Sequence, residues 1–190
     1  LLPADVQAQW LKSALAASTA PWKLVFLHHP PYSSGTGHGS ETDVQWPFEA
    51  WGASAVIAGH DHTYERILRD DNGDGAVMPY FVNGLGGRER HGFPANGFVQ
   101  GSAARYAASF GAMRLAATST RLHFEFHSIA NGGTLVDSYS LGIAAPIDLT
   151  LEVNGSQPAS RLQSTAGPYA IALDMDPGSV DHSLLWAVGF

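Results

Sequence analysis

Histidines follow directly after two apolar runs of the sequence, and their ring nitrogens could bind a metal ion. The first pair, His60 and His62, closes a run of small and apolar residues that begins at Ala55. Gly59 precedes the pair and lets the backbone turn out of a sheet without a Cβ clash. Imidazole is a common ligand for zinc and iron, so the pair could reach one metal ion or two adjacent ones. An HxH pair alone is equally compatible with histidines that pack or face solvent.

The second run, WKLVFLHH at residues 22–29, also ends in histidine. Alternate side chains of a strand share a face, so Phe26 and His28 are expected to point the same way. The two runs are predicted to be parallel strands whose C-terminal ends meet, which is where sites form in open α/β sheets. His28 is therefore expected to converge with His60 and His62.

At these residues the sequence resembles the calcineurin-like metallophosphoesterases, and within them the purple acid phosphatase-like branch. Residues 25–28, VFLH, match that family's VxxH block, and Pro31-Tyr32 follows it. Residues 59–66, GHDHTYER, match the longer and more specific GHxHxYER block. The resemblance covers about residues 5–141 and implies a metal-dependent phosphoesterase.

The resemblance also implies the fold class, which is α/β. Residues 1–142 are expected to form the C-terminal half of a four-layer αββα metallophosphoesterase sandwich. Pro146 marks a boundary, and residues 146–190 after it are expected to form a small β module, truncated at its end.

The active site implied by the resemblance contains two divalent or trivalent metal ions, iron, zinc or manganese, in the intact domain. His28 and His60 would bind one ion and His62 the other. A metal-bound hydroxide at this dinuclear centre would attack phosphorus in a small phosphorylated substrate. The expected reaction is the hydrolysis of phosphate monoesters, with diesters or nucleotides as further candidates.

A loop rich in proline, glycine and hydroxyl residues spans positions 30–46 and contains His38 between two glycines. Loops of this length commonly carry function. In the family a histidine of this loop faces the leaving-group oxygen or the phosphate, so His38 is the candidate catalytic acid. A solvated loop histidine is the alternative. His29 and Tyr32, close by in the sequence, are the candidate substrate-binding residues.

The family also has N-terminal sequence blocks of the types DxG, GDxxY and GNH(D/E), which supply a metal-bridging Asp and further ligands. None of these blocks occurs upstream of His28. The chain is therefore expected to be the C-terminal part of the catalytic domain and to need the N-terminal half as a partner. By itself it is expected to be nearly inactive.

The composition argues against several classes of partner. The formal net charge is −7, with only ten Lys and Arg, which disfavours nucleic acid and anionic membranes. No apolar run reaches the roughly 18 residues of a membrane span. The absence of cysteine excludes disulfides and thiolate zinc sites. Together with the resemblance, the low-charge composition favours a secreted or periplasmic protein.

Apolar periodicity predicts the elements that must position these residues. A helix is expected to begin near Asp5, with Val6, Trp10 and Ala14, and with Leu11 and Leu15 beside them, as one stripe that packs in the core. A short helix is expected over residues 44–51. The predicted strands cover residues 22–28, 55–59, 64–68, 78–83, 111–116, 121–127 and 134–141.

Residues 70–75, DDNGDG, match the start of a calcium-binding loop but are interpreted as a hairpin turn. The twelfth position of such a loop would be Phe81 rather than a glutamate, so the bidentate ligand is missing. Asn-Gly and Asp-Gly are strong turn signals between two strands.

The remaining histidines are expected to lie outside the site. Alternate residues of the strand at 121–127 face a core, so His123 and His127 face out and are expected to be solvated. Residues 88–109 are expected to be irregular, and His91 within them is interpreted as a surface residue rather than a substrate contact.

Two other functions remain open on the sequence alone. A mononuclear zinc hydrolase or lyase could use His28, His60 and His62 with one open position. Alternatively, the chain could be a non-catalytic extracellular binding or structural module. The metal count per intact domain separates the first alternative from a dinuclear phosphoesterase.

Overall fold

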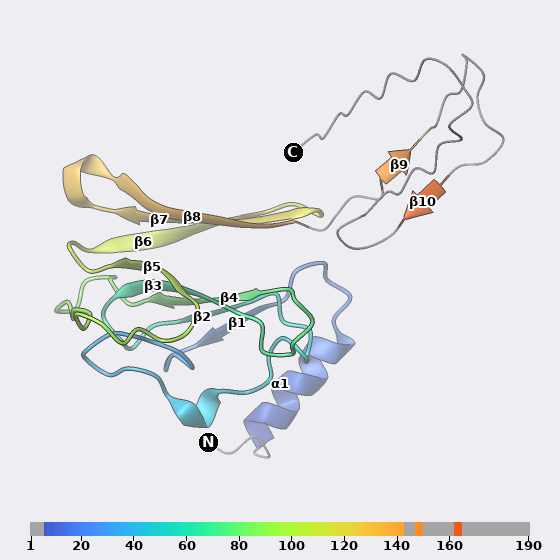
Figure 1. The fold of residues 1–190 in the computed structure, drawn as a ribbon, viewed down its shortest axis with the longest axis horizontal. Coiled ribbons are helices and arrows are strands. Elements are labelled where there is room, and N and C mark those ends of the chain that lie inside the picture. The colour runs from blue at the N-terminus through green and yellow to red at the C-terminus, as the bar shows by residue number, and fades with distance from the viewer. Residues whose placement is uncertain (1–5, 143–146, 150–161, 165–190) are drawn as a thin grey trace, which may run out of the picture. The chain divides into compact units, whose positions relative to one another are not determined.

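A mixed five-stranded sheet is the middle layer of the first of two units into which the chain divides, Leu1–Ile143 and Ala144–Phe190. The structure, a computed structural model, describes residues 6–142, 147–149 and 162–164. In the first unit a helix lies on one face of the mixed sheet and a three-stranded antiparallel sheet lies on the other (Figure 1). This mixed α/β arrangement confirms the predicted fold class.

The mixed sheet has the strand order β1-β2-β4-β3-β5. Its strands are β1 Leu24–Leu27, β2 Ala55–Ala58, β3 Tyr64–Arg69, β4 Met78–Asn83 and β5 Ser102–Tyr106. β1 and β2 are parallel, with Leu24 opposite Ala55 and Leu27 opposite Ala58, which confirms the predicted parallel pair. A strand covered on both faces is apolar throughout, and all four residues of β2 are buried.

The second sheet is an antiparallel meander of β6 Gly111–Ala117, β7 Arg121–Ser128 and β8 Thr134–Gly142, as the sequence predicts. Alternate residues of β7 are buried against the mixed sheet, and aromatic rings fill the space between the two sheets. The ring centroids of Phe124 and Phe81 lie 4.5 Å apart, and Phe126 stacks on Tyr64 with ring centroids 4.0 Å apart.

A charged contact also joins the two sheets. Asp137 of β8 accepts hydrogen bonds from the Tyr64 hydroxyl at 2.8 Å and from the Arg66 guanidinium at 2.8 and 3.0 Å. The Tyr and Arg of the GHxHxYER block therefore hold the second sheet against the strand that leaves the histidines.

The helix α1, Val6–Ala17, packs on the sheet through only part of the predicted stripe, since Leu15 is buried and Leu11 packs against the core. Val6 and Trp10 are 85% and 68% exposed, whereas Ala8 and Leu15 are buried. The prediction that Val6, Trp10 and Ala14 pack in the core is therefore wrong. Ala8 and Leu15 belong to one buried cluster with Val25 of β1. Lys23 Nζ donates a hydrogen bond to the Leu15 carbonyl at 2.8 Å near the helix end.

The helix predicted over residues 44–51 is also absent from the described structure. A short 3-10 helix, Thr42–Val44, is followed by residues 45–47, which have no regular secondary structure, and by a turn over residues 48–52. Val44, Trp46 and Phe48 are buried while the residues between them are exposed, so the segment alternates with a period of two. Strand β5 lies within the segment expected to be irregular, where its sequence SAARY carries little apolar signal.

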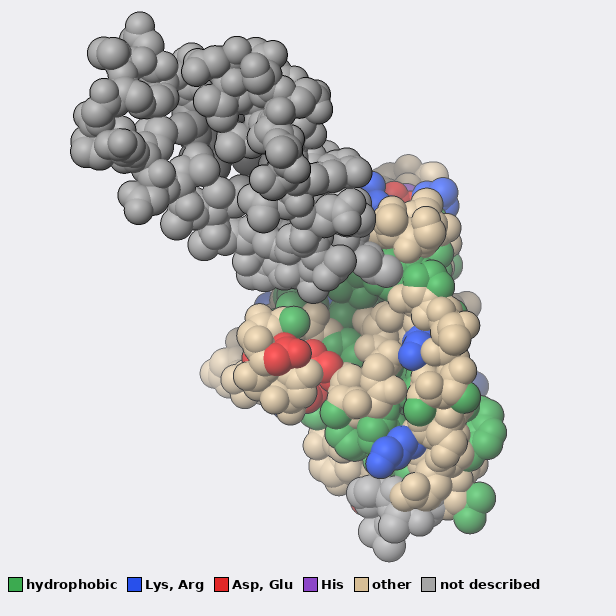
Figure 2. Space-filling view, turned by 90° about the vertical axis from the view of Figure 1, so that its right-hand side faces the viewer, with side chains coloured by type: hydrophobic (Ala, Val, Ile, Leu, Met, Phe, Trp, Pro, Cys, Tyr) green, Lys and Arg blue, Asp and Glu red, His purple; other side chains and the backbone are tan. Residues whose placement is uncertain are grey.

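A hairpin joins β3 to β4, as interpreted for residues 70–75. The Asp70 carboxylate accepts hydrogen bonds from the amides of Gly73, Asp74 and Gly75, and both glycines have positive φ. Acidic side chains gather on a protrusion of the face seen in Figure 2. The carboxylates of Asp70 and Asp74 lie within 4.8 Å of Glu49, a contact between distant segments that the sequence did not indicate.

In the second unit the structure describes β9, Ile147–Leu149, and β10, Leu162–Ser164, which pair antiparallel with Leu149 opposite Leu162. The rest of the predicted β module lies outside the described residues, as does the predicted helix start at Asp5. Within the described part of the chain, no helix has the length and hydrophobicity to span a bilayer.

Candidate metal centre

The histidines lie beyond the C-terminal ends of β1 and β2. The Gly59 amide donates a hydrogen bond to the His28 carbonyl at 3.1 Å, one residue past β2. This contact brings the two chain segments side by side, and His28 Nε2 lies 3.0 Å from His60 Nδ1. The fold therefore places two histidines that are far apart in the sequence close enough to bind the same metal ion.

His29 and His38 extend this pair into a cluster of four imidazoles. One ring nitrogen from each of His28, His29 and His60 lies within 4.8 Å of the other two. His38 stacks on His60, with ring centroids 3.9 Å apart and ring planes at 29°. The candidate catalytic acid and the candidate ligands thus occupy one patch at the surface.

His60 adopts an unusual backbone conformation, with a φ of 58° in the left-handed region. Residues other than glycine rarely adopt it, and such residues concentrate at functional sites. Burial, followed by the neighbouring imidazoles of His38, His29 and His28, lowers the pKa of His60 below its usual value. A histidine that stays neutral keeps a nitrogen lone pair available for a metal ion.

His62 lies in a second imidazole pair beside this cluster. Its ring stacks on His91 with centroids 4.3 Å apart, and its Nδ1 lies 2.6 Å from the Glu89 carbonyl oxygen. Because a carbonyl only accepts, Nδ1 carries the hydrogen and Nε2 keeps its lone pair. Metal-binding histidines commonly donate their second ring nitrogen to a backbone carbonyl in this way.

Asp61, between the two histidines of the HxH pair, is completely buried. Its carboxylate accepts hydrogen bonds from the Ser33 hydroxyl at 2.7 Å and the Gly39 amide at 3.0 Å, and it lies 3.0 Å from His91 Nδ1. Burial raises the pKa of Asp61, but the hydrogen bonds from Ser33, His91 and Gly39 together lower it below the usual value. The carboxylate is therefore ionised and acts only as an acceptor.

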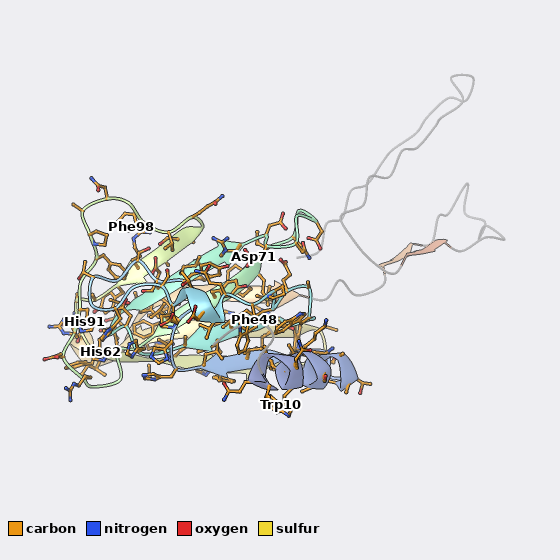
Figure 3. All side chains as sticks on the ribbon, turned by 90° about the horizontal axis from the view of Figure 1, so that it is seen from below. Trp10, Phe48, His62, Asp71, His91 and Phe98 are labelled. Atoms are coloured by element: carbon orange, nitrogen blue, oxygen red, sulfur yellow. The ribbon has the colours of Figure 1, made fainter. Side chains whose placement is uncertain are left out.

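Sequence reasoning did not find this role for Asp61, and it assigned His91 to the surface. In the structure His91 is partly buried and contacts both His62 and Asp61. Figure 3 shows His62 and His91 at one end of the unit, away from Trp10 on α1. Residue type and spacing could not join His91 to residues about thirty positions earlier.

Tyr32, predicted to bind substrate, packs against Tyr80 and Arg69 in the structure. Its ring packs edge-on against Tyr80 with centroids 4.9 Å apart, and the Arg69 guanidinium lies 4.0 Å above it. Burial, and after it the charge of Asp71, raises the pKa of Tyr32. These contacts resemble those of a packed residue more than those of a substrate contact.

The geometry is suitable for metal ions of the expected kind. Two nitrogens bound at typical zinc distances lie about 3.3 Å apart in a tetrahedral site. The separation of 3.0 Å between His28 Nε2 and His60 Nδ1 is close to that value. Imidazole nitrogen suits zinc and iron, so the donor chemistry and the spacing agree.

Two family models match the chain. Residues 2–64 match the calcineurin-like phosphoesterase family, and residues 77–138 match the family described as iron/zinc purple acid phosphatase-like protein C. The first match includes the histidines after β1 and β2. The second covers most of the segment from β4 to β8.

Similar proteins carry phosphatase names. Purple acid phosphatase 18 of Arabidopsis thaliana is 36% identical over 75 residues, which is 35% of this chain and 17% of that protein. Fe(3+)-Zn(2+) purple acid phosphatase 12 of the same plant is 35% identical over 88 residues, or 42% of this chain and 18% of that protein. Phosphoenolpyruvate phosphatase of Allium cepa is 35% identical over 71 residues, or 33% of this chain and 15% of that protein.

The matched segments span less than a fifth of these relatives. Among solved structures, one titled as GAP50, the anchor in the inner membrane complex of Plasmodium, superimposes with a TM-score of 0.58. The match covers 71% of this chain and 41% of that one at 22% identity. This likeness supports the fold and carries no information on activity.

Proposed function

The chain belongs to the calcineurin-like metallophosphoesterases, in their purple acid phosphatase-like branch, and we propose that it forms part of a dinuclear site that hydrolyses phosphate monoesters. The observation that carries this proposal is the meeting of His28 and His60 at 3.0 Å, with His38 stacked on His60. The phosphatase names of the relatives support the reaction class. Diesters and nucleotides are further candidate substrates.

His28 and His60 would hold one metal ion, and His62 would hold the other through Nε2. When bound, the two ions would neutralise the phosphoryl oxygens and lower the pKa of the attacking water. Zinc and iron suit the imidazole donors. Manganese suits carboxylates and is the third candidate, because the N-terminal half would add carboxylate ligands.

His38 would carry the proton that the leaving-group oxygen receives, and its place beside His60 supports that role. His29, within 4.8 Å of the nitrogens of His28 and His60, would contact a phosphoryl oxygen. Tyr32 would support the loop that carries His38, since it packs on Tyr80.

The site would take its remaining ligands from an N-terminal half with the DxG, GDxxY and GNH(D/E) blocks. The position of β1 at the edge of the mixed sheet supports this partner. Phe26 on that strand is 67% exposed, as expected of an apolar side chain that a further segment covers. The composition supports a secreted or periplasmic location.

The test is a phosphatase assay on the chain joined to such an N-terminal half, with iron, zinc or manganese added. We expect hydrolysis of 4-nitrophenyl phosphate that His60→Ala lowers by at least about 100-fold, a typical loss when a metal site is disrupted. His123→Ala is the matched control because His123 lies on the outer face of β7 and should leave the rate unchanged. Failure to hydrolyse any monoester or diester would reject the proposal.

The metal content of the same protein separates the alternatives. Two ions per chain support the dinuclear site, whereas one ion held by His28, His60 and His62 with retained hydrolysis would indicate a mononuclear enzyme. Metal binding without any hydrolysis would favour a non-catalytic module, because one fold can host both enzymes and binding proteins.

A further inference from the structure

The buried Asp61 carboxylate connects three segments of the site. It belongs to the turn that carries His60 and His62, it accepts hydrogen bonds from Ser33 and Gly39, which lie on either side of His38 in its loop, and it faces His91. A buried carboxylate is costly unless each of its oxygens is paired. Here Oδ2 has two donors and Oδ1 faces a ring nitrogen, so all three segments are held by one group.

The loop that carries His38 rests directly on Asp61 and His91. A Cβ atom on Gly35 would lie 2.2 Å from Asp61 Oδ2, and one on Gly37 would lie 1.8 Å from His91 Nδ1. The loop is also bonded to the segment after His91, since Thr36 N donates to the Gly92 carbonyl at 2.9 Å. The two glycines thus permit a close approach that fixes His38 relative to His91.

His91 in turn fixes the ring of His62. The two rings stack at 4.3 Å with planes at 20°, and the His91 amide donates to the His62 carbonyl at 3.0 Å. His91 Nδ1 lies 3.0 Å from Asp61 Oδ1 and 3.2 Å from the His62 amide nitrogen. The His62 amide donates its hydrogen bond to Nδ1, and the two contacts of this nitrogen, together with the stacking on His62, set the orientation of the His91 ring.

We propose that Asp61 and His91 are positioning residues that hold His38 and His62 in a fixed relation to each other. The pair thereby sets the distance between His38 as proton donor and His62 as ligand of one metal ion. These two roles rest on the phosphoesterase function proposed above. A displacement of about 1 Å can lower a rate by roughly 100-fold, so this support would affect chemistry more than substrate binding.

The first experiment measures imidazole nitrogens and needs no activity. In ¹H–¹⁵N spectra of the metal-free chain at constant pH, we expect His62 to show one tautomer, with Nδ1 protonated. His91→Ala removes the ring stacked on His62, which should loosen the contact of His62 Nδ1 with the Glu89 carbonyl, give a mixture of tautomers and broaden the His38 signals. His91→Asn offers a side-chain amide to Asp61 and removes the stacked ring, so it should affect His62 and spare His38.

The second experiment uses the chain joined to its N-terminal half. We expect Asp61→Asn and His91→Ala to lower kcat for an alkyl phosphate at least about tenfold more than kcat for 4-nitrophenyl phosphate, with KM little changed. The reason is that only the poor alkoxide leaving group needs a well-placed proton donor. A merely structural defect would lower both rates in proportion. His123→Ala again serves as the control.

Unchanged His62 and His38 signals in His91→Ala would overturn the inference, even with phosphatase activity intact. If His91→Ala fails to fold, His91→Asn replaces it, and a single unchanged His62 tautomer in that variant would overturn the inference as well. Absence of phosphatase activity in the wild-type protein would reject the proposed function, while the spectra would still decide on the positioning pair.

Discussion

Each imidazole of the site is supported by a different contact at the scale of the residue. His60 is held by a left-handed turn, His62 by the Glu89 carbonyl, and His38 by a loop that rests on Asp61. A side chain held by hydrogen bonds loses less freedom when it binds a ligand, because part of the ordering is already complete. These contacts therefore orient the ring nitrogens before a metal ion binds.

The conformation of His60 leads to a prediction that separates stability from binding. Glycine adopts positive φ without strain, so His60→Gly should leave the free energy of unfolding of the metal-free chain within about 1 kcal/mol of wild type. The same variant should lose zinc affinity by at least about tenfold. Urea unfolding and zinc titration measure the two effects.

His123→Gly provides the comparison, because His123 lies within strand β7. Glycine inside a strand lowers stability by roughly 0.5–1 kcal/mol, and zinc affinity should stay at the wild-type value. The account would be wrong if His60→Gly lowered stability more than His123→Gly and kept zinc affinity.

Sequence alone could identify the histidines of the site because motif and strand pattern agree there. His28, His60 and His62 each follow an apolar run, and the longer block is specific. His91 could not be found in this way, since its contacts with Asp61 and His62 join residues far apart in an otherwise weak pattern. The glycines at 35 and 37 were the available signal, because close approach of a loop requires them.

Helix α1 shows that the spacing of apolar residues can predict a helix without identifying which of its faces is buried. Of the predicted stripe, Leu15 is buried together with Ala8, whereas Trp10 stays exposed. The segment after the 3-10 helix, where Val44, Trp46 and Phe48 alternate inward, was mistaken for a helix because Pro47 fits a first turn. Strands β1 and β2 were predictable since continuous apolar runs followed by polar residues leave few alternatives.

This assignment of faces predicts opposite outcomes for two substitutions in α1. Leu15 is 6% exposed, so Leu15→Ala should lower the free energy of unfolding of the chain by about 2–5 kcal/mol. Trp10 is 68% exposed, and Trp10→Ala should change the free energy of unfolding by no more than about 0.5 kcal/mol. Urea unfolding of the two variants decides, and a larger loss for Trp10→Ala would show that the helix face is wrongly assigned.

The outer face of β7 carries a polar row with a predicted pH dependence. Hydrogen bonds from Arg114, and then from His127 and His123, lower the pKa of Glu125 to about 2. A lowered pKa in the folded state stabilises the fold above the usual glutamate pKa, and this contribution disappears as the pH falls through about 2. The row thus supports the sheet at neutral pH and fails only in strong acid.

A carbon NMR titration of the Glu125 carboxyl group should give a midpoint near 2, and Arg114→Ala should raise it. Arg114 is the matched site because it lies directly opposite Glu125 on β6. A wild-type midpoint at the usual value of 4.5 would mean that the row does not hold its charge in solution.

At the scale of the whole molecule, the first unit consists of a helix and two sheets, with candidate ligands at the end of two neighbouring strands. Asp137 links the sheets through Tyr64 and Arg66, so the block that carries the histidines also fastens the second sheet. Edge strand β1 with its exposed Phe26 lies beside the ligands and is where the proposed N-terminal half would join.

We propose that the chain by itself holds one metal ion of a two-metal site. The most direct measurement is the zinc content of the chain after loading and dialysis, together with its phosphatase turnover. We predict one zinc ion per chain, lost in His60→Ala and kept in His123→Ala, with no measurable turnover. Two tightly bound ions with robust hydrolysis of a phosphate monoester would show that the site is complete in this chain, and would contradict the account.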